Sequence, residues 1–99
     1  MSLTANQKRY LRGIAHHLHP LVTLAEKGPS DAVLKELEIA LLAHELVKVR
    51  ISAPDRETAA LWMDRLLEAT AARLVQKIGH VVTLYRRHPS EPKLSLPRA

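Results

Sequence analysis

The clearest candidate for ligand chemistry is the stretch LVTLAEKGPS at residues 21–30. It begins with an apolar run of strand length, which is followed by Lys27, Gly28 and Pro29. Gly28 can adopt positive φ, and Pro29 with Ser30 suits the start of a helix, whose free N–H groups favour anions. Lys27 adds a mobile cation, so the stretch predicts phosphate binding. The alternative is an ordinary turn with a solvated lysine, because one glycine does not specify a phosphate loop.

Positive charge is the second feature that points to a ligand. The chain has 99 residues, with 15 Lys and Arg against 10 Asp and Glu, a net charge of +5 and a pI near 10.0. This balance favours a polyanionic partner. Trp62 and two tyrosines are the only aromatic residues, too few for a sheet that stacks bases. Contact with phosphate groups is therefore the expected mode of binding.

Several classes of function are not expected. The chain lacks cysteine, which excludes disulfides and thiolate metal sites, and it has no P-loop, nucleophile elbow or HExxH motif. His16, His17 and His19 have no acidic ligand nearby in the sequence, and adjacent residues of a helix point about 100° apart, so we expect no metal site. We expect no enzyme, no cofactor and no small-molecule substrate. A nuclease assembled in space from histidines and carboxylates is the open alternative.

The length of the chain indicates one domain. We expect this domain at residues 1–87, followed by a C-terminal extension at residues 88–99 that contains proline and serine. The extension is expected to be flexible, and the alternative is that it packs on the sheet. No run approaches the roughly 20 apolar residues that span a bilayer. We therefore expect a soluble, cytoplasmic protein with no membrane partner.

Apolar periodicity predicts three helices and four strands in the order αβαβαββ. The helices are expected at residues 5–17, 30–44 and 55–70, and the strands at 21–24, 46–52, 73–78 and 81–86. Gly79 and His80 form the turn of a hairpin. The two strand–helix–strand units should be parallel crossovers and the last strand pair antiparallel. The predicted fold class is α/β (α+β), a single compact domain with a four-stranded mixed sheet.

The strand LVKVRIS at residues 46–52 is the clearest in the chain. Its alternation places aliphatic side chains on one face of the sheet and Lys48 and Arg50 on the other. Three helices cover one face of so small a sheet well and the other only partly. Together with Arg73 and Lys77, the alternation predicts that part of the less covered face is basic.

Five stretches of the sequence resemble a known family. They are QKRYLRGIAHHLHPLVTLAEKGPS at residues 7–30, HELVKVRI at 44–51, DRET at 55–58, VQKIGHVVTLYR at 75–86 and KLSLPR at 93–98. In this order they resemble the YhbY-like bacterial proteins, which share the CRM domain. The resemblance implies a fold similar to the C-terminal domain of initiation factor three. It also implies an RNA-binding protein that associates with precursors of the large ribosomal subunit, and so with ribosomal RNA, during ribosome biogenesis.

The signature of this family is a GxxG loop after the first strand, similar to the loop by which KH domains clamp a nucleic-acid backbone. Here the loop reads Ala25-Glu26-Lys27-Gly28, so Ala25 replaces the first glycine and Glu26 adds a negative charge. Alanine loses some access to positive φ. Glu26 opposes phosphate unless it turns away or pairs with Lys27.

The leading hypothesis is an RNA-binding monomer. Lys27 and the amides near Gly28 would hold phosphate, and further basic residues would extend the positive surface, namely Lys8, Arg12, Lys48, Arg50, Arg73, Lys77 and Arg86. The alternative is a protein-interaction module. Its acidic second helix would dock a basic ribosomal protein or a second copy of the chain, through Asp31, Glu36, Glu38 and Glu45.

Overall fold

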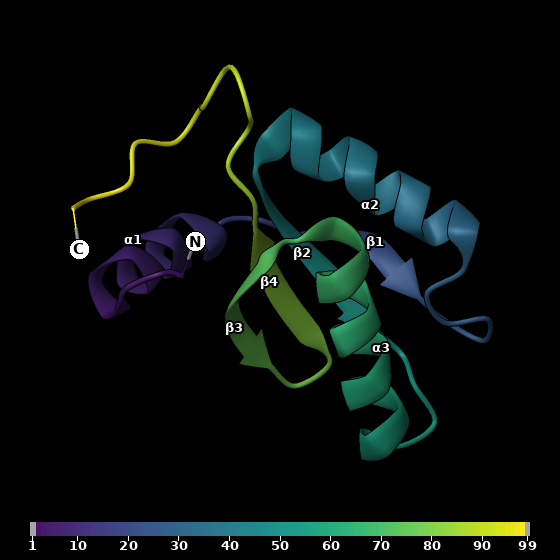
Figure 1. Ribbon diagram of the computed structural model, residues 1–99. Helices are drawn as coiled ribbons and strands as arrows, with labels where there is room; N and C mark the ends of the chain where they lie inside the picture. The colour runs from purple at the N-terminus through teal and green to yellow at the C-terminus, as the bar shows by residue number, and fades with distance from the viewer. Residues whose placement is uncertain (1, 99) are drawn as a thin grey trace.

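The computed structural model describes residues 2–98 and shows three helices and a four-stranded mixed sheet among them (Figure 1). The elements are α1 (Ala5–Ala15), β1 (Pro20–Leu24), α2 (Asp31–His44), β2 (Leu46–Ile51), α3 (Arg56–Thr70), β3 (Arg73–Ile78) and β4 (Val81–Tyr85). The strand order is β1-β2-β4-β3, with β1 parallel to β2 and the other pairs antiparallel. The predicted α+β fold class and mixed sheet are confirmed.

Helix α1 begins with a capping box. The Gln7 N–H donates to the Thr4 side-chain oxygen (3.2 Å), and the Thr4 N–H donates back to Gln7 Oε1 (3.0 Å). The helix ends at Ala15, two residues before the predicted end at His17. The chain closes a tighter turn there, and Pro20 opens β1, which disfavours helical backbone in the residue before it.

The other two helices also begin at side-chain caps. Ser30 accepts the Val33 N–H (3.3 Å) before α2, and the Asp55 carboxylate accepts the Thr58 N–H (2.7 Å) before α3. Both caps lie just outside the helices, because their backbone is extended. The caps determine the residue at which each helix begins and therefore where the loop between the preceding strand and the helix ends.

Two hydrophobic clusters lie on opposite faces of the sheet. Helices α2 and α3 cover one face along its length, with the buried side chains of Leu37, Leu41 and Leu66 against β1, β2 and β4 (Figure 1). Helix α1 buries Leu11 and Ala15 on the other face and covers only one end of it. The remainder of this second face stays open, as the sequence predicted.

A bulge in β3 reverses the side-chain alternation predicted for that strand. The pairing with β4 shifts between Leu74 and Gln76. Leu74 therefore packs on the α2–α3 side, while Val75 belongs to the cluster under α1 and Gln76 lies beside it on the open face. Lys77 returns to the α3 side, so the prediction that it shares the open face with Arg73 is wrong.

The chain after β4 passes the end of α2 and returns to α1 (Figure 1). Glu45, which follows α2 with a φ of 63°, is fully buried and accepts the N–H groups of His88 (2.7 Å), Lys93 (2.7 Å) and Leu94 (2.8 Å). Burial raises the pKa of the Glu45 carboxyl, but these three hydrogen bonds outweigh it and hold the pKa below its usual value. One buried carboxylate thus anchors the C-terminal segment.

Apolar contacts continue this anchoring along α1. Leu94 and Leu96 pack against the cluster under α1, and Gln7 Nε2 donates to the Pro97 carbonyl (3.0 Å). The segment therefore contacts α1, the end of α2 and the hydrophobic cluster that α1 forms with the sheet, and no residue of 88–98 lines the groove on the open part of this face. The flexibility expected of this segment stays a prediction.

Candidate nucleic-acid interface

The loop at residues 25–28 is a tight turn seated on α3. The Gly28 N–H donates to the Ala25 carbonyl (2.9 Å), and Gly28 has a φ of 59°. A Cβ at this position would lie 2.6 Å from Cε2 of Trp62. Gly28 is therefore required both by the backbone and by the indole, and this is the role of Trp62 that the sequence did not suggest. The side chains of Ala25, Glu26 and Lys27 are exposed on the outside of the turn.

The charges around this turn do not favour phosphate by themselves. Lys27 is flanked by Glu26 and by Asp31, the first residue of α2, and all three are exposed. Within residues 2–98 the single ion pair joins Arg86 and Glu38, so Glu26 is not neutralised by Lys27. One cation beside two carboxylates gives a net negative charge. The charges of this turn alone therefore do not provide a strong phosphate site.

A groove on the open sheet face gathers basic and polar side chains. Its volume is about 320 Å³. Residues 18–20, which lead into β1, line one side of it, and the other lining residues come from β2, β3 and β4, namely Lys48, Arg50, Gln76, Ile78, Val81 and Thr83. Thr83 of β4 pairs with both Lys48 and Gln76, and Val81 pairs with both Arg50 and Ile78. The groove therefore consists of two neighbouring rows across the sheet, each with one cation from β2.

The two cations of this groove are free to meet a ligand. Arg50 is exposed and Lys48 is half-buried, and neither takes part in the ion pair between Arg86 and Glu38. No carboxylate lines the groove among the residues described. Ile78, which is 66% exposed, and Val81 add an apolar surface beside the charges. The groove can hold phosphate on its cations and an apolar ring face on its aliphatic side chains.

Further predicted site residues surround the same side of the sheet. Lys8 and Arg12 lie one turn apart on α1, which packs on this face, and Arg12 is exposed. Arg73 is exposed at the start of β3, where it pairs with Tyr85 of the cluster under α1. These three residues therefore belong to the α1 side of the molecule, as do Lys48 and Arg50.

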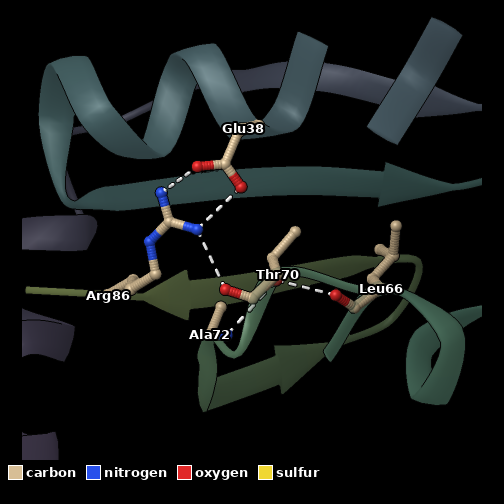
Figure 2. Close-up of polar contacts among 5 residues, drawn as sticks. All are labelled: Glu38, Leu66, Thr70, Ala72 and Arg86. Atoms are coloured by element: carbon tan, nitrogen blue, oxygen red, sulfur yellow. Dashed lines mark hydrogen bonds and ion pairs between the residues drawn. The ribbon is translucent and has the colours of Figure 1, made fainter. Parts of the chain in front are cut away.

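Arg86 is engaged inside the fold. Figure 2 shows its guanidinium bound in two places, to both carboxylate oxygens of Glu38 on α2 and to the Thr70 carbonyl at the end of α3. The bonds from Nη1 measure 2.8 Å to Glu38 and 2.9 Å to Thr70. The hydrogen bond from Arg86 lowers the pKa of Glu38, and the same bond raises that of Arg86. The prediction that Arg86 extends the RNA-binding surface is not supported, because its guanidinium makes three hydrogen bonds within the fold and its side chain is only 19% exposed.

The acidic surface predicted for the second helix is also smaller than expected. Glu38 is paired with Arg86, and Glu45 is buried under the C-terminal segment. Asp31 and Glu36 remain exposed. Two carboxylates of the four are thus used by the fold, and the interaction hypothesis loses half of its proposed contact residues.

The histidine cluster shows no sign of a metal centre. Within residues 2–98, no three side chains of His, Cys, Asp or Glu lie close enough to hold a metal ion. The rings of His16 and His17 instead pack edge to face, with centroids 5.3 Å apart. Among residues 2–98, no helix is long and apolar enough to cross a membrane.

Comparison with known proteins gives the family. The model of the CRS1/YhbY (CRM) domain matches residues 3–86. An RNA-binding protein of Haemophilus influenzae is 47% identical over 98 residues, which are 98% of this chain and 97% of that protein. A probable RNA-binding protein of Pseudomonas aeruginosa is 40% identical over 93 residues, 94% of this chain and 89% of the relative. The probable RNA-binding protein YqeI of Bacillus subtilis is 35% identical over 95 residues, 96% and 99% of the two chains.

A solved structure agrees with this assignment. The solution structure of a hypothetical Staphylococcus aureus protein, described as an RNA-binding candidate, matches with a TM-score of 0.80 and 32% sequence identity. The match covers 97% of this chain and all of that one. The chain therefore belongs to the CRS1/YhbY (CRM) domain family.

Proposed function

We propose that this protein binds RNA through the open face of its sheet. The observation that carries the proposal is the groove in which Lys48 and Arg50 lie beside apolar side chains, with no carboxylate partner in the described part of the chain. Relatives that match nearly the whole chain are named as RNA-binding proteins, which supports the same reading. Lys8 and Arg12 on α1 and Arg73 on β3 extend the positive surface on this side.

The contacts act mainly on the RNA backbone. Lysine and arginine position phosphates but carry little sequence information, so specificity comes from the shape of the RNA or from neighbouring proteins. Gln76 of β3, which is half-buried, adds a neutral hydrogen-bonding group beside the cations. The turn at Gly28 contributes the single cation of Lys27 and a backbone fixed in shape by Trp62. No step in this function needs a catalyst.

The RNA we propose is ribosomal. The resemblance of the sequence to the YhbY-like proteins implies association with precursors of the large ribosomal subunit during assembly in the cytoplasm. A monomer suits such a role, because the open basic face of its sheet can dock on exposed RNA. Docking of a protein partner on α2 is less favoured, because Glu38 and Glu45 are used within the fold.

Charge reversal on the two faces of the sheet tests this proposal. The variant K48E/R50E should bind a labelled single-stranded RNA at least about tenfold more weakly than wild type, because two phosphate contacts become repulsions. The matched control K35E/R65E makes the same change in net charge at exposed positions of α2 and α3. Fluorescence anisotropy measures both affinities, and circular dichroism confirms that both variants fold.

The salt dependence provides a second readout. If about four phosphates are contacted, the slope of log K against log salt should be about −3 for wild type and clearly shallower for K48E/R50E. Equal weakening in K48E/R50E and K35E/R65E would show that net charge, and not the groove, drives binding.

Sedimentation of cell lysate on a sucrose gradient tests the proposed ribosomal partner. Co-migration with large-subunit precursors is the expected result, and free protein at low salt contradicts it.

A further inference from the structure

A second cavity lies across the sheet from the groove, between the start of α3 and the turn that joins β3 to β4. Its volume is about 620 Å³, within the range of sites that hold small organic groups. Ile51 of β2 and Val82 of β4, both buried, and Met63 of α3 form its floor. The floor therefore offers aliphatic carbon and one polarisable sulfur, which suits the flat face of an aromatic ring.

The rim of this cavity is cationic. Arg56 at the start of α3 and Lys77 of β3 are both exposed, and neither joins an ion pair within residues 2–98. His80 of the hairpin turn also lines the cavity. The carboxylate of Asp55 also borders the cavity, and the N–H of Thr58, which it accepts as the cap of α3, lowers its pKa and keeps it ionised. The rim therefore carries two cations and one anion.

The cavity opens at the same sheet edge as the turn at residues 25–28. The Ile51 N–H donates to the His80 carbonyl (2.7 Å), and the Ser52 N–H donates to the Leu24 carbonyl (2.8 Å). These bonds place the hairpin turn and the end of β1 on either side of the end of β2. Helix α3 lies between them, since Trp62 packs on Gly28 and its neighbour Met63 lines the cavity.

We propose that this cavity receives one nucleotide of the bound RNA. The base lies on the floor of Ile51, Met63 and Val82, and the adjoining phosphates are held by Arg56 and Lys77. The combination is specific to a nucleotide, because its base has apolar faces while its phosphate is anionic. This inference rests on the RNA binding proposed above and adds a second contact region on the opposite side of the sheet.

Two kinds of variant test the cavity. Ala59 of α3 lines it, and A59L fills the space without changing charge. R56A/K77A removes the rim cations instead. The controls are A60L, an exposed neighbour on α3, and K35A/R65A, which removes two exposed cations elsewhere. Both cavity variants should bind a labelled single-stranded RNA about fivefold or more weakly than wild type, and both controls should stay within about twofold.

The methyl group of Met63 reports occupancy directly. The chain has two methionines, so the methyl signal of Met63 is readily assigned in an NMR spectrum. Addition of the RNA should shift this signal in wild type and in A60L, and R56A/K77A should need about fivefold or more RNA to reach the same shift. Thermal melts check that A59L folds. If A59L does not fold, R56A/K77A still tests the proposal, because both of its substitutions are at exposed positions.

Three results would overturn the inference. RNA that binds wild type and both cavity variants equally shows that the cavity is not used. An unchanged Met63 signal in saturated complex shows the same. A saturable shift caused by adenosine monophosphate, with none caused by the RNA, assigns the cavity to a free nucleotide instead. Failure of wild type to bind any RNA refutes the proposed function itself and is thereby distinguished from these outcomes.

Discussion

The two faces of the sheet use their charged residues differently. On the face covered by α2 and α3, Arg86 is bound by Glu38 and by the last turn of α3, so it joins three elements (Figure 2). On the face that α1 leaves open, Lys48 and Arg50 have no carboxylate partner among residues 2–98. Covered charges therefore stabilise the fold, whereas uncovered charges remain available for a ligand. This contrast predicts that substitutions of charges engaged within the fold change stability, whereas substitutions of charges without a partner change RNA binding.

The largest effect on stability is expected at Glu45. E45A removes the acceptor of three backbone N–H groups and leaves them without a partner near a buried site, which should cost about 3 kcal/mol of unfolding free energy. Urea denaturation measures the loss, and E36A, which removes an exposed carboxylate of α2, is the control. RNA affinity of the folded fraction should be unchanged. A loss of affinity at constant stability would contradict the separation of roles.

A substitution at Gly28 tests whether contact with Trp62 holds the turn at residues 25–28 in its conformation. G28A requires alanine at a φ of 59° and drives its Cβ into Trp62, so it should cost about 2 kcal/mol. The double variant G28A/W62A removes the clash and should cost less than the two single variants added together. Additive costs in thermal melts would show that the indole does not restrict this position.

Arg86 tests the covered face. R86A leaves the Thr70 carbonyl and the Glu38 carboxylate without their donor, and we expect a cost of about 1–2 kcal/mol, because Glu38 is 43% exposed and water replaces part of the bond. Its RNA affinity should match wild type. R50A should show the opposite behaviour, with unchanged denaturation and RNA binding weaker by about fivefold. Equal RNA affinities for R50A and wild type would remove Arg50 from the site.

The dependence of stability on pH is expected to be the smallest effect. Glu38 and Glu45 both have pKa values below those of unfolded chains, so their contribution is complete above the unfolded pKa, near 4.5. It is lost as pH falls through the lower folded-state pKa values. Unfolding free energy should therefore decline gradually below about pH 5. R86A should weaken the part of this decline that belongs to Glu38, and an identical profile in R86A would contradict the pairing.

Local patterns in the sequence determined most of the fold. The capping box at Thr4, the serine before α2 and the alternation of β2 each depend on residues within one turn or one strand. Such patterns report which residues can share a helix face or a strand face. They therefore also placed Lys48 and Arg50 on one face of the sheet, because alternation in an unbroken strand leaves no other choice.

Only the tertiary structure decided which cations remain free. Arg86 meets Glu38 from 48 residues away, and Glu45 meets backbone groups that are equally distant in sequence, so no local pattern marks either contact. The bulge beside Val75 moved Lys77 to the α3 side, although the strand reads as an ordinary alternating run. The contact of Trp62 with Gly28, which leaves no room for a side chain at residue 28, also depends on the position of α3 in the fold. The sequence alone determined which residues are charged. Which of these charges are free to bind a ligand depends on contacts between helices and strands that lie far apart in the chain.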